Sequence, residues 1–142
     1  MNERLAGLTI RFSARPEGLV ELHAAFDRFF AQADGAGAAI QTHDKVAMVT
    51  AAAEIAANIV DHACHDLPDA EVSVALARNR DSMEARFEDP GAACGDVDSD
   101  ASNPIPHLGI GLQVARASVD FLEYARDGEI NRWLLVRRLH GP

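Results

Sequence analysis

Glu54 and Asn58 lie four residues apart in an alanine-rich segment, residues 51–63. If this segment is an α-helix, the two side chains project from one face, about 6 Å apart along the axis. The carboxylate can accept a proton from an attacking hydroxyl group or water, and the amide oxygen is a hard ligand suited to Mg²⁺. Taken alone the pair is a weak signal, because glutamate and asparagine on a helix are usually just solvated.

Asp89 and Gly91 follow directly after a run of alternating apolar and polar residues that ends at Glu88. An aspartate at the end of a strand can accept a hydrogen bond from an exocyclic amine such as that of adenine. A glycine next to it lets a flat ring approach the backbone closely. Asp-Pro-Gly is also good turn chemistry, so a simple turn is the alternative interpretation.

Gly109-Ile110-Gly111-Leu112 lies where a long irregular segment meets a helical pattern. Glycines here expose backbone N–H groups at a helix N-terminus, where the partial positive charge favours phosphate. The chain has no G-x-x-x-x-G-K-[ST] sequence, so this is not a Walker P-loop. The alternative is a flexible loop end followed by an ordinary helix start.

The spacing of apolar residues predicts the elements that must position these side chains. Thr42 is a candidate N-cap for the long helix that carries Glu54 and Asn58, and Asp127-Gly128 between two alternating runs is a hairpin signal. The predicted elements are, in chain order, a strand at 8–12, helices at 17–33 and 42–64, strands at 72–77 and 83–88, a short helix at 112–122 that runs into a strand at 121–126, and a strand at 129–139.

This order predicts an α+β fold, a two-layer sandwich in which helices cover one face of a mostly antiparallel, mixed sheet. No internal repeat or linker divides the chain, so we expect one domain over residues 1–142. Residues 90–108 have no periodicity and collect Gly, Asp, Ser, Asn and Pro. Loops of that length inside a compact domain are often lids or binding loops, and we expect a lid here.

The bulk composition is that of an ordinary soluble protein: 142 residues, 48% hydrophobic and 25% charged. The formal net charge of -9 provides no broad positive field for a phosphate backbone, which argues against direct nucleic-acid binding. A charged start and the absence of a long apolar run predict neither a signal peptide nor a membrane span, so we expect a cytoplasmic protein. Cys64 and Cys94 make no metal-type spacing, and we expect two free thiols.

The motifs taken together, in this order along the chain, are far more specific than any one of them alone. The chain resembles the ATPase domain of the gyrase, histidine-kinase and MutL superfamily, which has the Bergerat ATP-binding fold. The short chain is most similar to anti-sigma-factor serine/threonine kinases of the RsbW type. The similarity extends over roughly residues 5–139. The segments that carry it are residues 51–63, which resemble the N-box, Asp89-Pro90-Gly91, which resembles the first glycine box, Gly109-Ile110-Gly111-Leu112, which resembles the second, and Asp127-Gly128 before the last strand.

The resemblance implies that ATP and Mg²⁺ are held between the long helix and the lid. Asn58 would then ligate Mg²⁺, Glu54 would be the general base, and Asp89 would bind the adenine amine. The residues that would line the nucleotide are Gly91, Gly109, Ile110, Gly111 and Leu112. Members of this family phosphorylate a serine or threonine of an anti-anti-sigma (STAS) partner and sequester a sigma factor, usually as homodimers.

One departure from the family pattern concerns the segment before the second glycine box. Many relatives carry an arginine there that can stabilise charge on the transferred phosphate, whereas this chain has Pro106, His107 and Leu108. A nucleotide-binding protein that sequesters its partner with little or no kinase activity is therefore the alternative function. A third class, the ATPase part of a sensor histidine kinase, is disfavoured because few residues precede the first predicted strand.

Two segments contain candidate metal ligands. His62 and His65, with Asp61, lie near the end of the long helix and could share a metal, but no third ligand has fitting spacing. The segment 96–100 resembles the start of a calcium loop, yet its sixth and twelfth positions are Ala101 and His107. A solvated acidic lid is the favoured interpretation of that segment.

Overall fold

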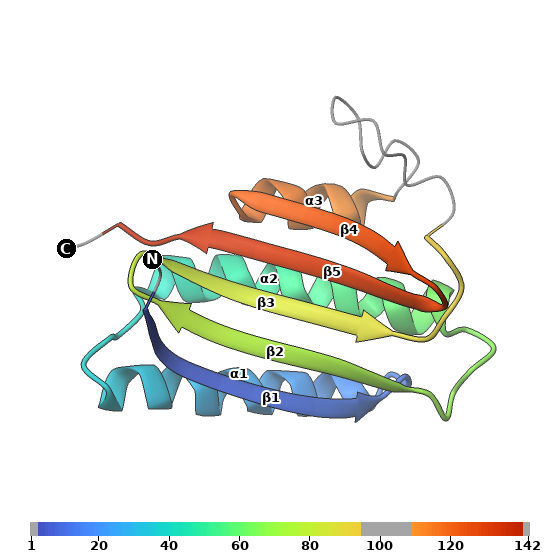
Figure 1. Cartoon of the computed structure of the whole chain (residues 1–142), viewed down its shortest axis with the longest axis horizontal. Coiled ribbons are helices and arrows are strands. Elements are labelled where there is room, and N and C mark those ends of the chain that lie inside the picture. The colour runs from blue at the N-terminus through green and yellow to red at the C-terminus, as the bar shows by residue number, and fades with distance from the viewer. Residues whose placement is uncertain (1–2, 95–108, 141–142) are drawn as a thin grey trace.

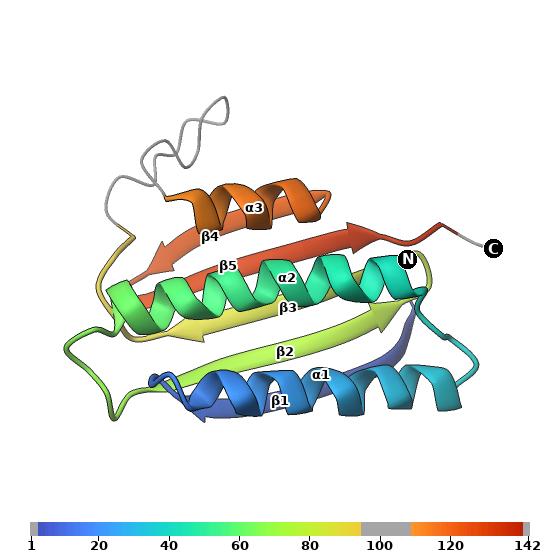
Figure 2. The same ribbon diagram turned by 180° about the vertical axis from the view of Figure 1, so that it is seen from behind.

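The computed structural model describes residues 3–94 and 109–140 of the chain, and its helices lie together on one face of a curved sheet (Figure 1). Figure 2 shows the same arrangement from the helical side. The elements in chain order are β1 (Arg4–Ser13), α1 (Gly18–Gly35), α2 (Thr42–Asn58), the π-helical turn η1 (Ile59–Ala63), β2 (Glu71–Asn79), β3 (Ser82–Asp89), α3 (Ile110–Ser118), β4 (Phe121–Asp127) and β5 (Ile130–Arg138).

The sheet has the order β1-β2-β3-β5-β4. Each neighbouring pair of strands in it is antiparallel. The two-layer α+β fold expected from the sequence is therefore confirmed, although the described sheet lacks the mixed component we expected. Because β5 lies between β3 and β4, residues near positions 89, 126 and 131 are brought to one end of the sheet.

The core lies between the helices and the sheet, where alternate strand residues point toward the helices. Phe12, Phe87 and Leu135 are almost completely buried on the sheet side, and Met48 and Ile55 of α2 are completely buried on the helix side. Each such side chain contributes roughly 1.5–3 kcal/mol by burial. The alanines of α2 let the helix lie close to the strands, which fixes the face that carries Glu54 and Asn58.

The start of α2 differs from the prediction. Thr42 is the first helical residue and Gln41 is the N-cap, with no side-chain cap hydrogen bond. The acid of the first turn, Asp44, is buried, and its Oδ1 accepts a hydrogen bond from Nε of Arg137 at 2.6 Å. The other end of Arg137 donates to the carbonyl oxygen of Ser118 at 2.7 Å. This pair therefore ties the beginning of α2 to β5 and to the end of α3.

The end of the long helix also differs from the single helix expected over residues 42–64. The α-helical pattern stops at Asn58, and a π-helical turn follows, in which the Cys64 N–H donates to the carbonyl oxygen of Ile59 at 2.7 Å. Such turns insert one residue per turn and change the direction of the side chains that follow, and they occur frequently at functional sites.

By length and composition, the continuous helix Thr42–Ala63 could also cross a membrane. Buried core helices pass the same criterion, and this helix packs its apolar face against the sheet, with Met48, Ile55 and Ile59 completely buried. The finding is therefore weak evidence, and the packing is that of a core helix.

The C-terminal hairpin confirms the Asp-Gly signal, with Asp127 paired to Ile130 across a two-residue turn. Gly128 occupies the first turn position with φ of 62°, which favours glycine. The short helix predicted over 112–122 was too long, because α3 ends at Ser118 and Leu122 instead pairs with Leu135 in the sheet. Apolar spacing alone does not separate the end of this helix from the strand. Of the predicted lid, residues 95–108 lie outside the described part of the chain.

Candidate functional site

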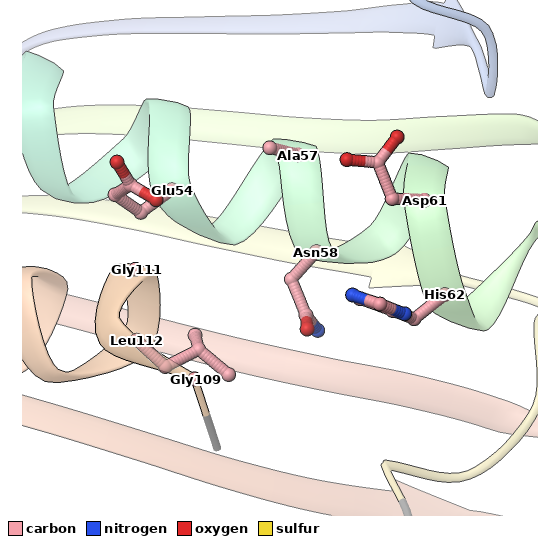
Figure 3. A pocket seen from close by; sticks show the side chains of 8 residues that line it. All are labelled: Glu54, Ala57, Asn58, Asp61, His62, Gly109, Gly111 and Leu112. Atoms are coloured by element: carbon pink, nitrogen blue, oxygen red, sulfur yellow. The ribbon is translucent and has the colours of Figure 1, made fainter.

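A pocket of about 210 Å³ lies between the C-terminal half of the long helix and the start of α3. In Figure 3, Asn58 and His62 project to the side on which α3 begins, whereas Asp61 projects the opposite way. The residues that line the pocket are Glu54, Ala57, Asn58, Asp61, His62, Gly109, Gly111 and Leu112. Two motifs separated by about fifty residues in the sequence thus line one cavity, an arrangement that the family resemblance implied.

The start of α3 is open to the pocket. Gly109 is the N-cap with an extended backbone conformation, and Ile110 is 78% exposed. The first N–H groups of a helix have no partner within it and carry partial positive charge, so this end can bind an anion. Gly111 allows a very close approach, since a Cβ there would lie 2.3 Å from Oε2 of Glu54. Glycine at position 111 therefore leaves room for the Glu54 carboxylate beside the helix start.

Asp89 lies at the end of β3 and is only 1% exposed. Its Oδ1 accepts hydrogen bonds from the Gly91 N–H at 2.8 Å and from the Asn131 amide at 3.0 Å, and the Cys64 thiol lies 3.7 Å away. Its Oδ2 is buried and has no hydrogen-bond partner among the described residues. An unsatisfied buried acceptor costs about 1–3 kcal/mol, so Oδ2 fits an atom that awaits a donor from a ligand. An exocyclic amine is such a donor.

Gly91 packs directly against the end of the long helix. A Cβ at this position would lie 2.3 Å from the carbonyl oxygen of Ala63, and the Ala92 N–H donates to that same oxygen at 2.8 Å. The glycine that follows Asp89 is therefore required by contact with the protein backbone itself. It fixes the segment after β3 against η1, next to the pocket.

Gly91→Ala is expected to destabilise the fold by at least about 2 kcal/mol, because a methyl group would overlap backbone atoms that cannot move independently. Chemical denaturation of the purified variant measures this loss. Gly35→Ala is the matched control, since a Cβ at Gly35 meets nothing within 4 Å. Equal stability of the two variants would contradict the packing role of Gly91.

Comparison with known proteins identifies the family of this chain. The model of the family described as "Histidine kinase-like ATPase domain" matches residues 12–137. The chain belongs to the histidine kinase-like ATPase domain family. No curated protein sequence matches it.

A solved structure of similar fold is that of the RsbU and RsbW domains of Rv1364c from Mycobacterium tuberculosis, with a TM-score of 0.67 and 21% sequence identity. The match covers 94% of this chain and 32% of that one, so this histidine kinase-like ATPase domain spans about a third of the length of the protein it matches. At this level of identity the likeness concerns the fold.

Cys64 and Cys94 of the ATPase domain are both free thiols, as expected. Burial, followed by the nearby charge of Asp89, raises the pKa of the Cys64 thiol to about 11. Burial likewise raises the pKa of Cys94, although a hydrogen bond with the Asn58 side chain lowers it in part. Both groups are therefore protonated at neutral pH, and Cys64 can act as a weak donor toward Asp89.

No group of three or more His, Cys, Asp and Glu side chains in residues 3–94 and 109–140 is arranged to hold a metal ion. The proposed pair of His62 and His65 thus gains no third ligand there, and the calcium-like segment 96–100 lies outside these residues. A magnesium site at Asn58 is a different case, because Mg²⁺ is commonly held by one or two protein ligands together with substrate phosphates and water. That assignment stays a prediction.

The predicted site residues fall into two neighbouring groups, except for Ile110, which is exposed and does not line the pocket. Glu54 and Asn58 line the pocket with Gly109, Gly111 and Leu112. Asp89 and Gly91 are hydrogen-bonded to each other, and Gly91 packs against the last residue of η1. Sequence reasoning considered Asp61 and His62 only as metal ligands and missed that both line the pocket. His62 lies four residues after Asn58, a helical spacing that could have indicated it. No role was predicted for Asn131, which lies just after the Asp127-Gly128 turn.

Proposed function

We propose that this chain is an ATP-dependent protein serine/threonine kinase of the RsbW type that also acts as an anti-sigma factor. The observation that carries the proposal is that Glu54 and Asn58 of the long helix line the same pocket as the N-terminus of α3. Phosphoryl transfer needs chiefly positioning, charge neutralisation and a base near the acceptor hydroxyl, and this pocket has groups of each kind.

Each side chain has one role in this proposal. Asn58 ligates Mg²⁺ through its amide oxygen, and the N–H groups at the start of α3 bind the phosphates. Asp89 accepts the adenine amine on Oδ2, the atom with no partner among the described residues. When bound, Mg²⁺ neutralises charge on the phosphate oxygens.

The chemical step transfers the terminal phosphoryl group of ATP to a serine or threonine hydroxyl. The hydroxyl oxygen forms the new bond to phosphorus as the bond to the bridging oxygen breaks, and ADP leaves. Glu54 takes the hydroxyl proton in this step. The Glu54 carboxylate lies beside Gly111 at the helix start, near the proposed phosphate site.

The acceptor in this proposal is an anti-anti-sigma (STAS) protein, and the sequestered partner is a sigma factor or another regulator. The similarity in fold to the solved RsbW domain supports this partner class. The family resemblance further supports a cytoplasmic homodimer. The net charge of -9 favours protein partners over direct contact with nucleic acid.

Incubation of the full chain with γ-labelled ATP, Mg²⁺ and a STAS-domain protein encoded beside it tests the proposal. We expect a labelled serine or threonine on the STAS protein, and no label when Mg²⁺ is chelated. A tight ATP-dependent complex without label would favour the second function, partner binding without turnover. The residues at 106–108, where relatives carry an arginine, make that outcome the main competitor. Absence of ATP binding would reject both functions.

A further inference from the structure

Three polar residues form one row across the end of the sheet. The register pairs Arg126 with Asn131 across β4 and β5, and Asn131 with Asp89 across β5 and β3. Asn131 is in the middle of this row and is 1% exposed. A buried amide between a guanidinium group and a carboxylate can offer its oxygen as acceptor to the first and its nitrogen as donor to the second.

The orientation of the Asn131 amide is determined by its neighbours. Its oxygen accepts hydrogen bonds from Arg126 at 2.8 Å and from the Tyr124 hydroxyl. An arginine side chain has only donors, so the group that faces it must be the carbonyl oxygen. The Tyr124 hydroxyl accepts from the Cys94 N–H at 2.9 Å, which leaves its proton for Asn131. A flipped amide would place donors against donors.

With this orientation fixed, the amide nitrogen must point toward Asp89 and the segment after it. It donates to Oδ1 of Asp89 at 3.0 Å and to the carbonyl oxygen of Ala92 at 2.8 Å, and the Gly91 carbonyl oxygen lies at 3.3 Å. Together with the Gly91 N–H, Asn131 satisfies Oδ1. The other oxygen, Oδ2, has no partner among the described residues.

We propose that Asn131 is a positioning residue for purine specificity, because its amide determines which oxygen of Asp89 remains free to accept the amine of the base. This inference rests on the proposed ATP function. An acceptor held in one place attracts a 6-aminopurine and repels the C6 carbonyl oxygen of a 6-oxopurine. Without Asn131, the carboxylate loses a donor on Oδ1 and can turn, so both the attraction and the rejection weaken.

Titration with three nucleotides tests this role: ATP, purine riboside triphosphate, which has no group at C6, and inosine triphosphate, which has an oxygen there. For the unmodified protein we expect the tightest binding for ATP and the weakest for inosine triphosphate. Asn131→Ala should weaken ATP binding about tenfold and change the affinity for purine riboside triphosphate less than about threefold. A purely structural role would lower all three affinities by the same factor, and that result would overturn the inference.

Asn131→Leu is the second variant, because it has a similar side-chain shape, adds no charge beside Asp89 and has no donor for it. It should show the same selective loss for ATP, so the test survives if the alanine variant does not fold. Tyr124→Phe is the control, since it leaves the bond between Asn131 and Asp89 in place and should retain the preference for ATP. An unmodified protein that binds none of the nucleotides would overturn the proposed function and this inference with it. Retained preference in both Asn131 variants would overturn this inference alone.

Discussion

Asn58→Ala is expected to lower the affinity for Mg²⁺-ATP at least about a hundredfold, equivalent to about 2.7 kcal/mol. The physical reason is that alanine removes the amide group, which projects to the side on which α3 begins and where we propose that phosphate binds (Figure 3). Asn58 also contacts the Cys94 thiol, so its removal loosens the segment after Asp89. Isothermal titration calorimetry with and without Mg²⁺ measures the change.

Two controls separate metal binding from packing in that experiment. Asn58→Asp keeps an oxygen ligand of similar size and should retain Mg²⁺-dependent binding. In Asn58→Ala, chelation of Mg²⁺ should cause little further loss, because the metal ligand has already been removed. Undiminished affinity of the alanine variant would reject Asn58 as the magnesium ligand and with it the assignment of this pocket to the phosphates.

The sequence could predict the pocket because its two halves depend on local patterns. Glu54 and Asn58 share a helix face at any tertiary arrangement, and Gly109 and Gly111 mark a helix start whatever lies next to it. That the two halves lie together was implied by the family resemblance and by neither local pattern alone. The Asp127-Gly128 hairpin was predictable for the same local reason, whereas the place of β5 between β3 and β4 was not.

The features that the sequence could not predict depend on register or on a single irregular turn. Nothing in residues 59–63 marks a π-helical turn, yet this turn determines the directions of Asp61 and His62. Asn131 is one polar residue at the start of a strand, and its role exists only because β5 pairs with β3 and β4 at that register. Long-range pairing of this kind leaves no short motif.

Glu54→Gln should leave ATP affinity within about threefold of the unmodified protein and lower the rate of phosphate transfer about 10²- to 10⁴-fold, the usual contribution of a general base. Glutamine is preferred to alanine as the first variant, because the Glu54 side chain fills the space beside Gly111. Glu54→Ala should lose transfer equally while opening a gap there. Single-turnover transfer of label from γ-labelled ATP to the STAS protein measures the rate, and calorimetry measures the affinity.

Asp61→Asn is the matched control for that experiment, because Asp61 lines the same pocket but its carboxylate projects to the opposite side of the helix (Figure 3). We expect transfer within about threefold of the unmodified rate, since a base must lie within hydrogen-bond reach of the hydroxyl it deprotonates. Equal transfer by Glu54→Gln and the unmodified protein would remove Glu54 as the base. Loss of transfer in Asp61→Asn alone would assign that role to Asp61, and the acceptor hydroxyl would then have to enter from the side of the helix away from α3.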